Sequence, residues 1–376
     1  MIYLDNAATS FPKPPQVLRA MTGVMEKFGA NPGRGGHRLA VSAGRVVERC
    51  REAAAELLGV RSPERVIFTR CCTESLNLAI AGTVKPGDEV ICSHGEHNAV
   101  MRVLARLVSR DDITVKVLQP DARGLLSPDT LRQALTTRTR LVILCHASNV
   151  TGVVQPVAAM GAVCREAGVP LLVDAAQSAG TLDVTLDVLN ADMIAMPGHK
   201  GLLGPHGTGM LALREGIDPE PLMVGGTGSM SESALQPDIL PDRYESGTLN
   251  LPGIAGLLAG LSFLRRFRRE IAEHEQELDR RLRRQLADLP NVTLVGDDSV
   301  PRVAVTSIIP RGGDSGALAD TLSDSGVAVR AGLHCAPAIH AWLGTLESGT
   351  VRFSPGPFTT AQDVDDAAAL LARLTR

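Results

Sequence analysis

The chain has 376 residues, of which 44% are hydrophobic and 21% are charged. This length exceeds one ordinary domain, and the composition is typical of a globular enzyme. The 38 basic and 41 acidic residues nearly cancel, which argues against a dedicated nucleic-acid-binding protein with a basic stripe. No apolar run approaches the roughly 18 residues of a membrane span, and no secretory signal is visible at the N-terminus. We therefore expect a cytoplasmic enzyme without a membrane or nucleic-acid partner.

The first two thirds of the chain alternate between short apolar runs and amphipathic stretches from about residue 45 to 215. This pattern predicts a βαβ sheet. The expected strands are 65–69, 89–93, 113–118, 140–146, 170–174, 192–196 and 209–213, and the expected helices between them include 74–81, 99–107, 127–135 and 157–167. Several apolar runs, such as 141–144 and 171–173, are continuous, as in strands of sheets covered on both faces. We therefore expect a large α/β domain.

The pattern changes near Gly253, where a long, charge-rich amphipathic helix is expected over 254–289. It is followed by expected strands at 302–309, 327–330 and 350–353, and by expected helices at 315–325 and 361–374. These elements predict a smaller α+β domain, formed by residues 1–13 and 253–376, beside a large domain over 14–252. Two loops rich in Gly, Ser and Pro, 225–247 and 331–349, are candidate parts of a site because long loops are commonly functional.

The candidate reactive residues lie at the ends of two expected strands. Asp174 ends strand 170–174, and Lys200 follows the next strand in the loop PGHKG. Ligands of parallel α/β sheets bind outside the carboxyl ends of the strands, so both side chains should face one crevice. Pyridoxal 5′-phosphate (PLP) needs an amine for a Schiff base and a carboxylate opposite its pyridine nitrogen. A helix cap and a surface lysine would explain either residue alone, but the pair favours PLP. Glycines flanking Lys200 would let the ring approach the backbone closely.

Other candidate residues surround this crevice. Thr73 can cap the helix after strand 65–69, where free N–H groups suit an anion, although capping alone is the simpler explanation. His97 could stack on a planar cofactor or be structural. The His94–His97 spacing resembles a metal pair, but no third ligand accompanies it, so no metal is expected. The loop around Thr248 offers further backbone and hydroxyl donors.

Cys335 is one of seven cysteines, most of which we expect to be reduced and buried. It lies in a polar loop, and its neighbours Arg330 and His334 would favour a thiolate, so it is a candidate nucleophile. Arg352 is a lone guanidinium in an expected strand. It needs an anion, either a substrate carboxylate or an internal salt-bridge partner.

Together these residues resemble the class V aminotransferase family and, within it, the cysteine desulfurase and selenocysteine lyase branch. The matching motifs follow the family's order: YLDNAAT (3–9), RGGH (34–37), TES (73–75), HN (97–98), SNVTG (148–152), VDAAQ (173–177), GHK (198–200), ESGT (245–248), the Cys335 loop and VR (351–352). The resemblance implies a PLP-dependent transferase fold (aspartate aminotransferase-like, fold type I), with a large parallel or mixed sheet and a smaller α+β domain.

The resemblance also implies roles for individual residues. Around the cofactor, Lys200 holds PLP and moves protons, Asp174 pairs with the pyridine nitrogen, Gln177 contacts the ring hydroxyl, His97 stacks on the ring, and Thr73 and His199 bind the phosphate. Thr248 would come from the other subunit of a homodimer, whose active sites lie at the interface. Asn149 and Arg352 would hold the substrate carboxylate.

The implied reaction converts L-cysteine into L-alanine, with Cys335 taking the sulfur as a persulfide that an acceptor protein could receive. The surroundings of this thiol are closer to the SUF-type branch. Selenocysteine lyase, another PLP-dependent C–S lyase, an aminotransferase and an inactive docking relative remain alternatives. Two departures affect the phosphate site: Pro197 replaces a common Ser or Thr, and Cys71-Cys72 stand in a turn that often carries glycine.

Overall fold

The large domain is organised around a mixed seven-stranded sheet with the strand order β2-β8-β7-β6-β5-β3-β4. A computed structural model describes residues 1–33, 35–311 and 314–375, so Arg34 of the RGGH motif lies outside the described residues. The strands are β2 (Val66–Thr69), β3 (Glu89–Ser93), β4 (Thr114–Leu118), β5 (Thr139–Cys145), β6 (Leu171–Asp174), β7 (Met193–Pro197) and β8 (Gly209–Leu213). Each lies within one residue of its expected bounds. Strands β4, β3, β5, β6 and β7 pair in parallel, whereas β8 runs antiparallel to both β7 and β2.

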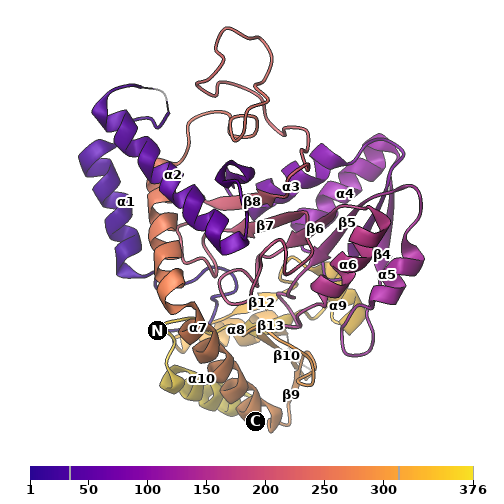
Figure 1. Ribbon diagram of the computed structural model, residues 1–376. Helices are drawn as coiled ribbons and strands as arrows, with labels where there is room; N and C mark the ends of the chain where they lie inside the picture. Colours follow the sequence, from indigo (N-terminus) through magenta and orange to yellow (C-terminus); the bar gives the residue numbers. More distant parts are fainter. Residues whose placement is uncertain (34, 312–313, 376) are drawn as a thin grey trace.

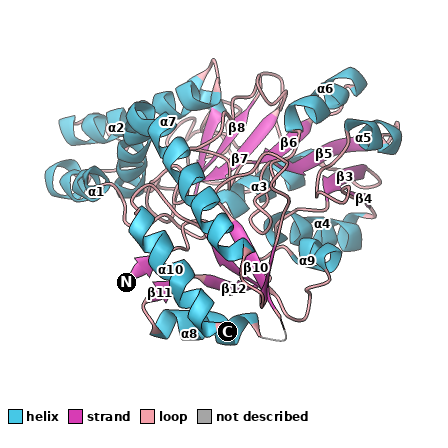
Figure 2. Cartoon of the chain, turned by 90° about the horizontal axis from the view of Figure 1, so that it is seen from below, coloured by secondary structure: helices cyan, strands magenta, loops and turns pink. Residues whose placement is uncertain are grey.

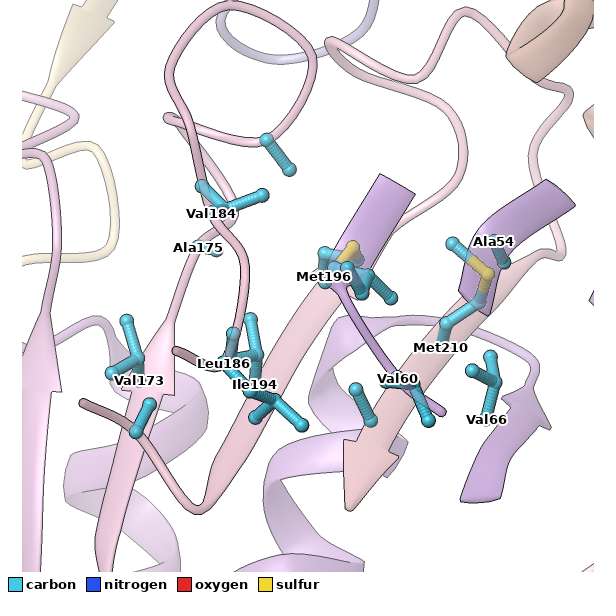
Figure 3. Packing of buried hydrophobic residues seen from close by; sticks show 14 of the residues in the cluster. Ala54, Val60, Val66, Val173, Ala175, Val184, Leu186, Ile194, Met196 and Met210 are labelled. Atoms are coloured by element: carbon cyan, nitrogen blue, oxygen red, sulfur yellow. The ribbon is translucent and has the colours of Figure 1, made fainter. Parts of the chain in front are cut away.

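Helices cover both faces of this sheet, which explains the continuous apolar runs of its central strands. One face packs Val173, Ile194 and Met196 into a core shared with Ala54 (Figure 3). The other face packs residues such as Leu172 against α3 (Cys72–Thr83) and α4 (Asn98–Asp111). Helices α5 (Pro128–Ala134) and α6 (Val157–Ala167) complete the layers (Figures 1 and 2).

Two N-terminal helices are absent from the expected elements. Helix α1 (Pro15–Phe28) and helix α2 (Arg38–Leu58) both pack on the long helix α7 (Leu251–Ala287), as Figure 1 shows. Helix α2 ends at Gly59, whose φ of 64° is the left-handed conformation that favours glycine at a helix end. After α2 in the chain, a short 3-10 helix, η1 (Pro63–Arg65), leads into β2.

The small domain contains a four-stranded antiparallel sheet with the order β12-β13-β10-β9. Its strands are β9 (Val292–Leu294), β10 (Thr306–Pro310), β12 (Arg330–Gly332) and β13 (Thr350–Phe353). Near the N-terminus, β1 (Ile2–Tyr3) pairs in parallel with β11 (Val327–Ala328). Leu4 therefore shares a core with α8 (Ser315–Asp324) and α10 (Ala361–Leu374), which lie together at the lower end of α7 (Figures 1 and 2).

Three expectations for this region need correction. The single strand expected over 327–330 is two short strands in different sheets, because the chain turns between them. The strand expected over 302–309 begins only at residue 306. The loop expected over 331–349 contains helix α9 (Pro337–Leu343), which has proline at its first position and Gly344 at its end.

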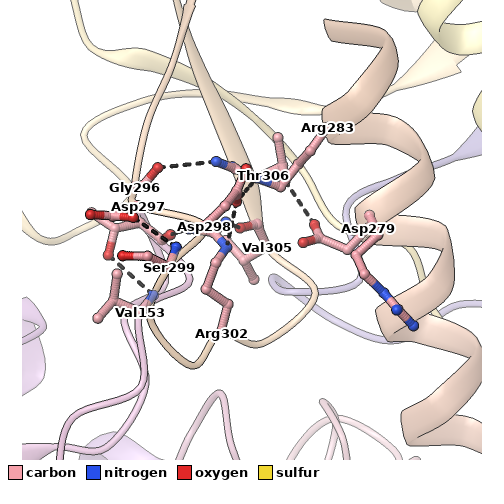
Figure 4. Close-up of polar contacts among 12 residues, drawn as sticks. Val153, Asp279, Arg283, Gly296, Asp297, Asp298, Ser299, Arg302, Val305 and Thr306 are labelled. Atoms are coloured by element: carbon pink, nitrogen blue, oxygen red, sulfur yellow. Dashed lines mark hydrogen bonds and ion pairs between the residues drawn. The ribbon is translucent and has the colours of Figure 1, made fainter. Parts of the chain in front are cut away.

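A polar cluster joins the small domain to a turn of the large domain (Figure 4). The Arg302 guanidinium donates to the carbonyls of Thr151 at 2.5 Å and Val305 at 2.8 Å. In the same cluster, the Thr306 hydroxyl donates to the Asp279 carboxylate at 2.7 Å. The turn that carries Asn149 is thereby fixed against the small-domain sheet.

No helix within the described part of the chain is long and apolar enough to cross a lipid bilayer.

Candidate active site

A cavity of about 230 Å³ lies at the carboxyl ends of the central strands, between the large sheet and residues of the small domain. It receives most of the predicted site residues. Those that line it are Thr73, His97, Asn149, Asp174, Gln177, His199, Lys200 and Arg352. Thr248 is exposed and does not belong to this lining, and Cys335 lies beside it, next to the lining residues Arg330 and His334.

Asp174 and Lys200 face the same cavity, as the crevice argument requires. Burial lowers the pKa of the Lys200 amine, and the nearby Asp174 carboxylate opposes this shift. A lowered pKa leaves more of the amine neutral, which is the form that attacks a carbonyl carbon. Asp174 is buried, and its Oδ1 accepts the N–H of Ala176 at 2.9 Å. The pair therefore combines a reactive amine with a fixed carboxylate.

The glycines around Lys200 allow close contacts within the protein. A Cβ on Gly201 would lie 2.1 Å from the Ala179 carbonyl oxygen, and a Cβ on Gly198 would lie 2.1 Å from the Thr208 hydroxyl oxygen. These close approaches are to the protein itself. Glycine is therefore needed for the lysine loop to pack against its neighbouring turns.

His97 is held by the start of helix α4. Its Nδ1 accepts the Ala99 N–H at 3.0 Å, so the ring caps the helix and carries its remaining proton on Nε2. Burial lowers the pKa of the imidazole, and the Asp174 carboxylate opposes that shift. The ring is therefore a neutral plane in the cavity wall, in an orientation that its helix fixes.

The N-terminus of α3 lies at the wall of the cavity. The helix begins at Cys72, with Cys71 at the capping position, so the expectation that Thr73 caps it is wrong. The first N–H groups of a helix have no acceptor within the helix and attract anions. Nearby, His199 Nδ1 is buried without a hydrogen-bond partner. Burial, with a smaller effect of Lys200, lowers the pKa of His199 to about 4, so the ring is neutral.

Arg352 is only 1% exposed and is anchored inside the protein. Its Nη2 lies 2.9 Å from the Asp5 carboxylate, and its Nη1 donates to the Asn149 carbonyl at 3.1 Å. The internal salt bridge considered from the sequence is therefore present. The Nε of Arg352 remains without a hydrogen-bond partner, so the guanidinium keeps one donor for a further acceptor.

Cys335 occupies a tight loop between β12 and α9. His334 and Cys335 both have left-handed backbones, with φ of 47° and 58°, which is unusual for residues other than glycine. The Asn98 N–H donates to the Cys335 carbonyl at 2.7 Å, and the Asn149 side chain donates to the His334 carbonyl at 2.6 Å. Both contacts tie the loop to the large domain.

The charge beside the Cys335 thiol comes from one residue and not from two as expected. Arg330 Nη2 lies 3.8 Å from the sulfur. His334 does not add a positive charge, because burial and the Arg352 charge lower its pKa to about 2. Its Nε2 lies 2.9 Å from the Thr350 hydroxyl, so this histidine supports the loop as a neutral ring.

Comparisons with known proteins agree with this geometry. Residues 2–366 match the family model of class-V aminotransferases. The chain belongs to the class V aminotransferase family. A probable cysteine desulfurase of Methanothermobacter thermautotrophicus is 34% identical over 371 residues, which cover 96% of this chain and 92% of the relative. A cysteine desulfurase of Salmonella typhimurium is 33% identical over 386 residues, which cover 100% and 94%.

Solved structures agree with the family assignment. The apo structure of a cysteine desulfurase from Thermococcus onnurineus has a TM-score of 0.92 and 32% identity, and the match covers 100% of this chain and 94% of that one. A cysteine desulfurase from Escherichia coli has a TM-score of 0.89 and 29% identity, with coverage of 100% and 95%. The expected fold, with its mixed sheet in the large domain, is confirmed.

The donors of this class V site fit PLP. Three lining residues, His199, His334 and Arg352, each have a buried nitrogen without a hydrogen-bond partner in the described chain. An anionic cofactor and its amino-acid substrate supply acceptors for such groups. A buried amine, a buried carboxylate and a planar neutral ring complete the set that a pyridine aldehyde requires.

Two contributors to the site were not predicted. Asp5 pairs with Arg352 across 347 residues of sequence, a separation at which spacing carries no information. The only signal for Asp5 is its place in the YLDNAAT motif. Cys72 was noted as a departure in the phosphate turn, but nothing in the sequence indicated that its sulfur lies 3.7 Å from Asp174 Oδ1.

Proposed function

We propose that this chain is a PLP-dependent cysteine desulfurase that converts L-cysteine to L-alanine and takes the sulfur onto Cys335 as a persulfide. The observation that carries the proposal is the meeting of Lys200 and Asp174 in one cavity, with a cysteine loop beside it. The relatives named as cysteine desulfurases cover nearly the whole chain, which favours this reaction over others of the family.

Each of the cavity residues would have a separate role in the reaction. PLP, when bound, withdraws electrons from the bonds around the substrate α-carbon. Lys200 would hold the cofactor and then move the Cα proton, which its lowered pKa favours. Asp174 would face the pyridine nitrogen, and the fixed ring of His97 would lie against the cofactor plane. Gln177, whose amide donates to the Ala7 carbonyl at 3.0 Å, would contact the ring hydroxyl.

The two ends of the cavity would hold the phosphate and the substrate carboxylate. Thr73 and His199 lie at the phosphate end, where the N-terminus of α3 adds its free N–H groups. Pro197 offers no hydroxyl there, so these groups carry more of the binding. Arg352, through its unpartnered Nε, and Asn149 would hold the carboxylate.

Cys335 would complete the reaction as the sulfur acceptor. Its thiolate forms a bond to the substrate sulfur, the substrate Cβ–S bond breaks, and Cβ takes a proton to give alanine. Arg330, 3.8 Å from the sulfur, stabilises the negative charge of the thiolate. The left-handed loop holds Cys335 next to Arg330 and His334, which line the cavity.

We propose in addition a cytoplasmic homodimer. All seven cysteines lie in the described part of the chain and are free, in keeping with a reducing compartment. Thr248 is exposed, where it could reach the cavity of a second subunit. The segment 222–239, which projects from the large domain in Figure 1, exposes apolar side chains that a partner subunit could cover: Leu222, Met223, Val224, Met230, Leu235 and Ile239.

We also propose that the chain forms two domains. The large domain would comprise residues 14–252, and the small domain would comprise residues 1–13 and 253–376. The packing of Leu4 in the small-domain core supports this division. An acceptor protein could then receive the persulfide sulfur from the loop at the domain boundary.

Replacement of Cys335 with Ala tests the proposal directly. Alanine and sulfide release from cysteine should be lost, whereas turnover of selenocysteine should survive, since selenium is the better leaving group. Cys164→Ala, which removes a buried thiol in α6, is the matched control and should keep both activities. Full activity of Cys335→Ala on cysteine would refute the persulfide role. Pyruvate and ammonia in place of alanine would indicate a C–S lyase.

A further inference from the structure

Cys72 places a thiol against the carboxylate that faces the cofactor site. It is the first residue of α3, and its Sγ lies 3.7 Å from Asp174 Oδ1. The same oxygen accepts the Ala176 N–H at 2.9 Å. Both donors therefore converge on Oδ1, and Oδ2 is left for another partner.

The position of Cys72 is set by close packing of the turn before it. Gly209 on β8 lies under this turn, and a Cβ there would be 2.6 Å from the Cys71 carbonyl carbon. The Thr69 hydroxyl donates to the Cys71 carbonyl at 3.1 Å and lies 2.8 Å from the Ser75 hydroxyl. The turn is therefore fixed at both of its ends, and the thiol has little freedom to leave Asp174.

The surroundings of the Cys72 thiol keep it protonated. Burial raises the pKa of the Cys72 thiol, the Asp174 carboxylate raises it further, and Lys200 opposes them. A thiolate beside the carboxylate would place two negative charges together in a buried site, which is costly. Cys72 is therefore an S–H donor and not a second nucleophile.

We propose that Cys72 is a positioning residue, which donates its S–H to Asp174 Oδ1 so that Oδ2 is the oxygen presented to the pyridine nitrogen. This inference rests on the proposed function, because it assumes that PLP occupies the cavity. A thiol is a weak donor, so its contribution should be modest but specific to the state of the pyridine ring.

The first test uses PLP-free protein and does not depend on activity. The infrared S–H stretching band of Cys72 is obtained as the difference between wild type and Cys72→Ala. It should lie at lower frequency than the band of Cys92, obtained in the same way from Cys92→Ala. Cys92 is buried in β3, and its sulfur makes no hydrogen bond within the described residues. Asp174→Asn should move the Cys72 band and leave the Cys92 band unchanged.

Alkylation provides a second measurement on the same PLP-free protein. Loss of the Asp174 charge lowers the pKa of the Cys72 thiol, so Asp174→Asn should increase the rate of modification at Cys72. We expect an increase of about threefold or more, because the reactive species is the thiolate. Mass spectrometry reports the rate at Cys72 separately from the rate at other cysteines. An unchanged S–H band together with an unchanged alkylation rate would overturn the contact.

The third measurement addresses the pyridine ring. In PLP-loaded protein, Cys72→Ala should shift the midpoint of the pH titration of cofactor absorbance by about half a unit, the scale of one weak hydrogen bond. Cys92→Ala should not shift it. A midpoint unchanged by Cys72→Ala would overturn the positioning role. Failure of the wild type to bind PLP would refute the proposed function, whereas the infrared and alkylation results would still report on the thiol contact.

Discussion

The Asp5–Arg352 pair allows a sharp test of how the substrate end of the cavity is held. Replacement of Asp5 with Asn keeps the size of the side chain and removes the charge that balances a guanidinium exposed by only 1%. A hydrogen bond between charged groups contributes about 1.5–3 kcal/mol, and removing one partner of a fully buried pair costs about 3–5 kcal/mol. The Asp5 side chain is 20% exposed and Asn can still accept a hydrogen bond, so we expect a loss of about 2 kcal/mol.

Asp365→Asn is the matched control. Arg281 contacts Asp365 through two hydrogen bonds of 2.6 and 2.7 Å, but both side chains are far more exposed, at 41% and 31%. Exposed pairs contribute about 1 kcal/mol or less. Geometry alone would therefore predict the larger loss for Asp365→Asn, because Asp5 accepts only one hydrogen bond from Arg352, of 2.9 Å, whereas burial predicts the larger loss for Asp5→Asn.

Both variants are compared by urea unfolding and by the kinetics of alanine release. The Asp5 variant should unfold at lower urea concentration and show a raised KM for cysteine, because Arg352 loses the contact that orients it. Asp365→Asn should leave KM unchanged. Equal losses of stability in the two variants, or an unchanged KM in Asp5→Asn, would refute the reasoning about Arg352.

Three further predictions concern the fold around the site. Burial raises the pKa of Glu96 to about 8, whereas the unfolded chain loses this proton near pH 4.5. As the pH rises from 4.5 to 8, the titration of Glu96 should therefore lower the free energy of unfolding by up to about 1.4 kcal/mol per pH unit. Glu96→Gln should remove that slope in unfolding curves across pH 4.5–8, and an unaltered slope would contradict the assignment. Gly209→Ala should cost about 1–3 kcal/mol and weaken PLP binding, since its Cβ meets the backbone of Cys71. Titration with PLP measures this affinity, and a wild-type affinity in Gly209→Ala would show that the turn can move to accommodate the added Cβ. Ile194→Ala should cost about 2–5 kcal/mol in urea unfolding, because Ile194 is fully buried in the core shown in Figure 3. Val188→Ala, at a side chain 49% exposed, should change stability by no more than about 0.5 kcal/mol, and similar losses in the two variants would argue against this packing.

The central strands of the large sheet could be predicted because they are buried on both faces. A continuous apolar run such as that of β5 has few alternative explanations when helical stretches flank it. Helix α2 was missed, although Ala43, Val47, Cys50 and Ala54 follow helical spacing and Gly59 marks its end. Its apolar stripe is narrow and built partly of alanine, and it packs on α7 as well as on one face of the sheet.

The site was predictable to the extent that it follows from strand ends. Asp174 and Lys200 are placed by the ends of β6 and β7, so parallel topology brings them together. The partner of Arg352 and the contact of Cys72 depend on tertiary packing between distant segments, for which sequence spacing gives no rule. The same applies to His334, whose neutrality follows from burial that the polar loop sequence did not suggest.

The Cys335 loop shows why its backbone and its thiol can be tested separately. The left-handed conformations of His334 and Cys335 cost about 1–2 kcal/mol each. Contacts with Asn98 and Asn149 offset this cost, and both use backbone carbonyls of the loop. A change of the Cys335 side chain leaves those carbonyls in place. Loss of desulfuration in Cys335→Ala would therefore report on the missing sulfur and not on a displaced loop.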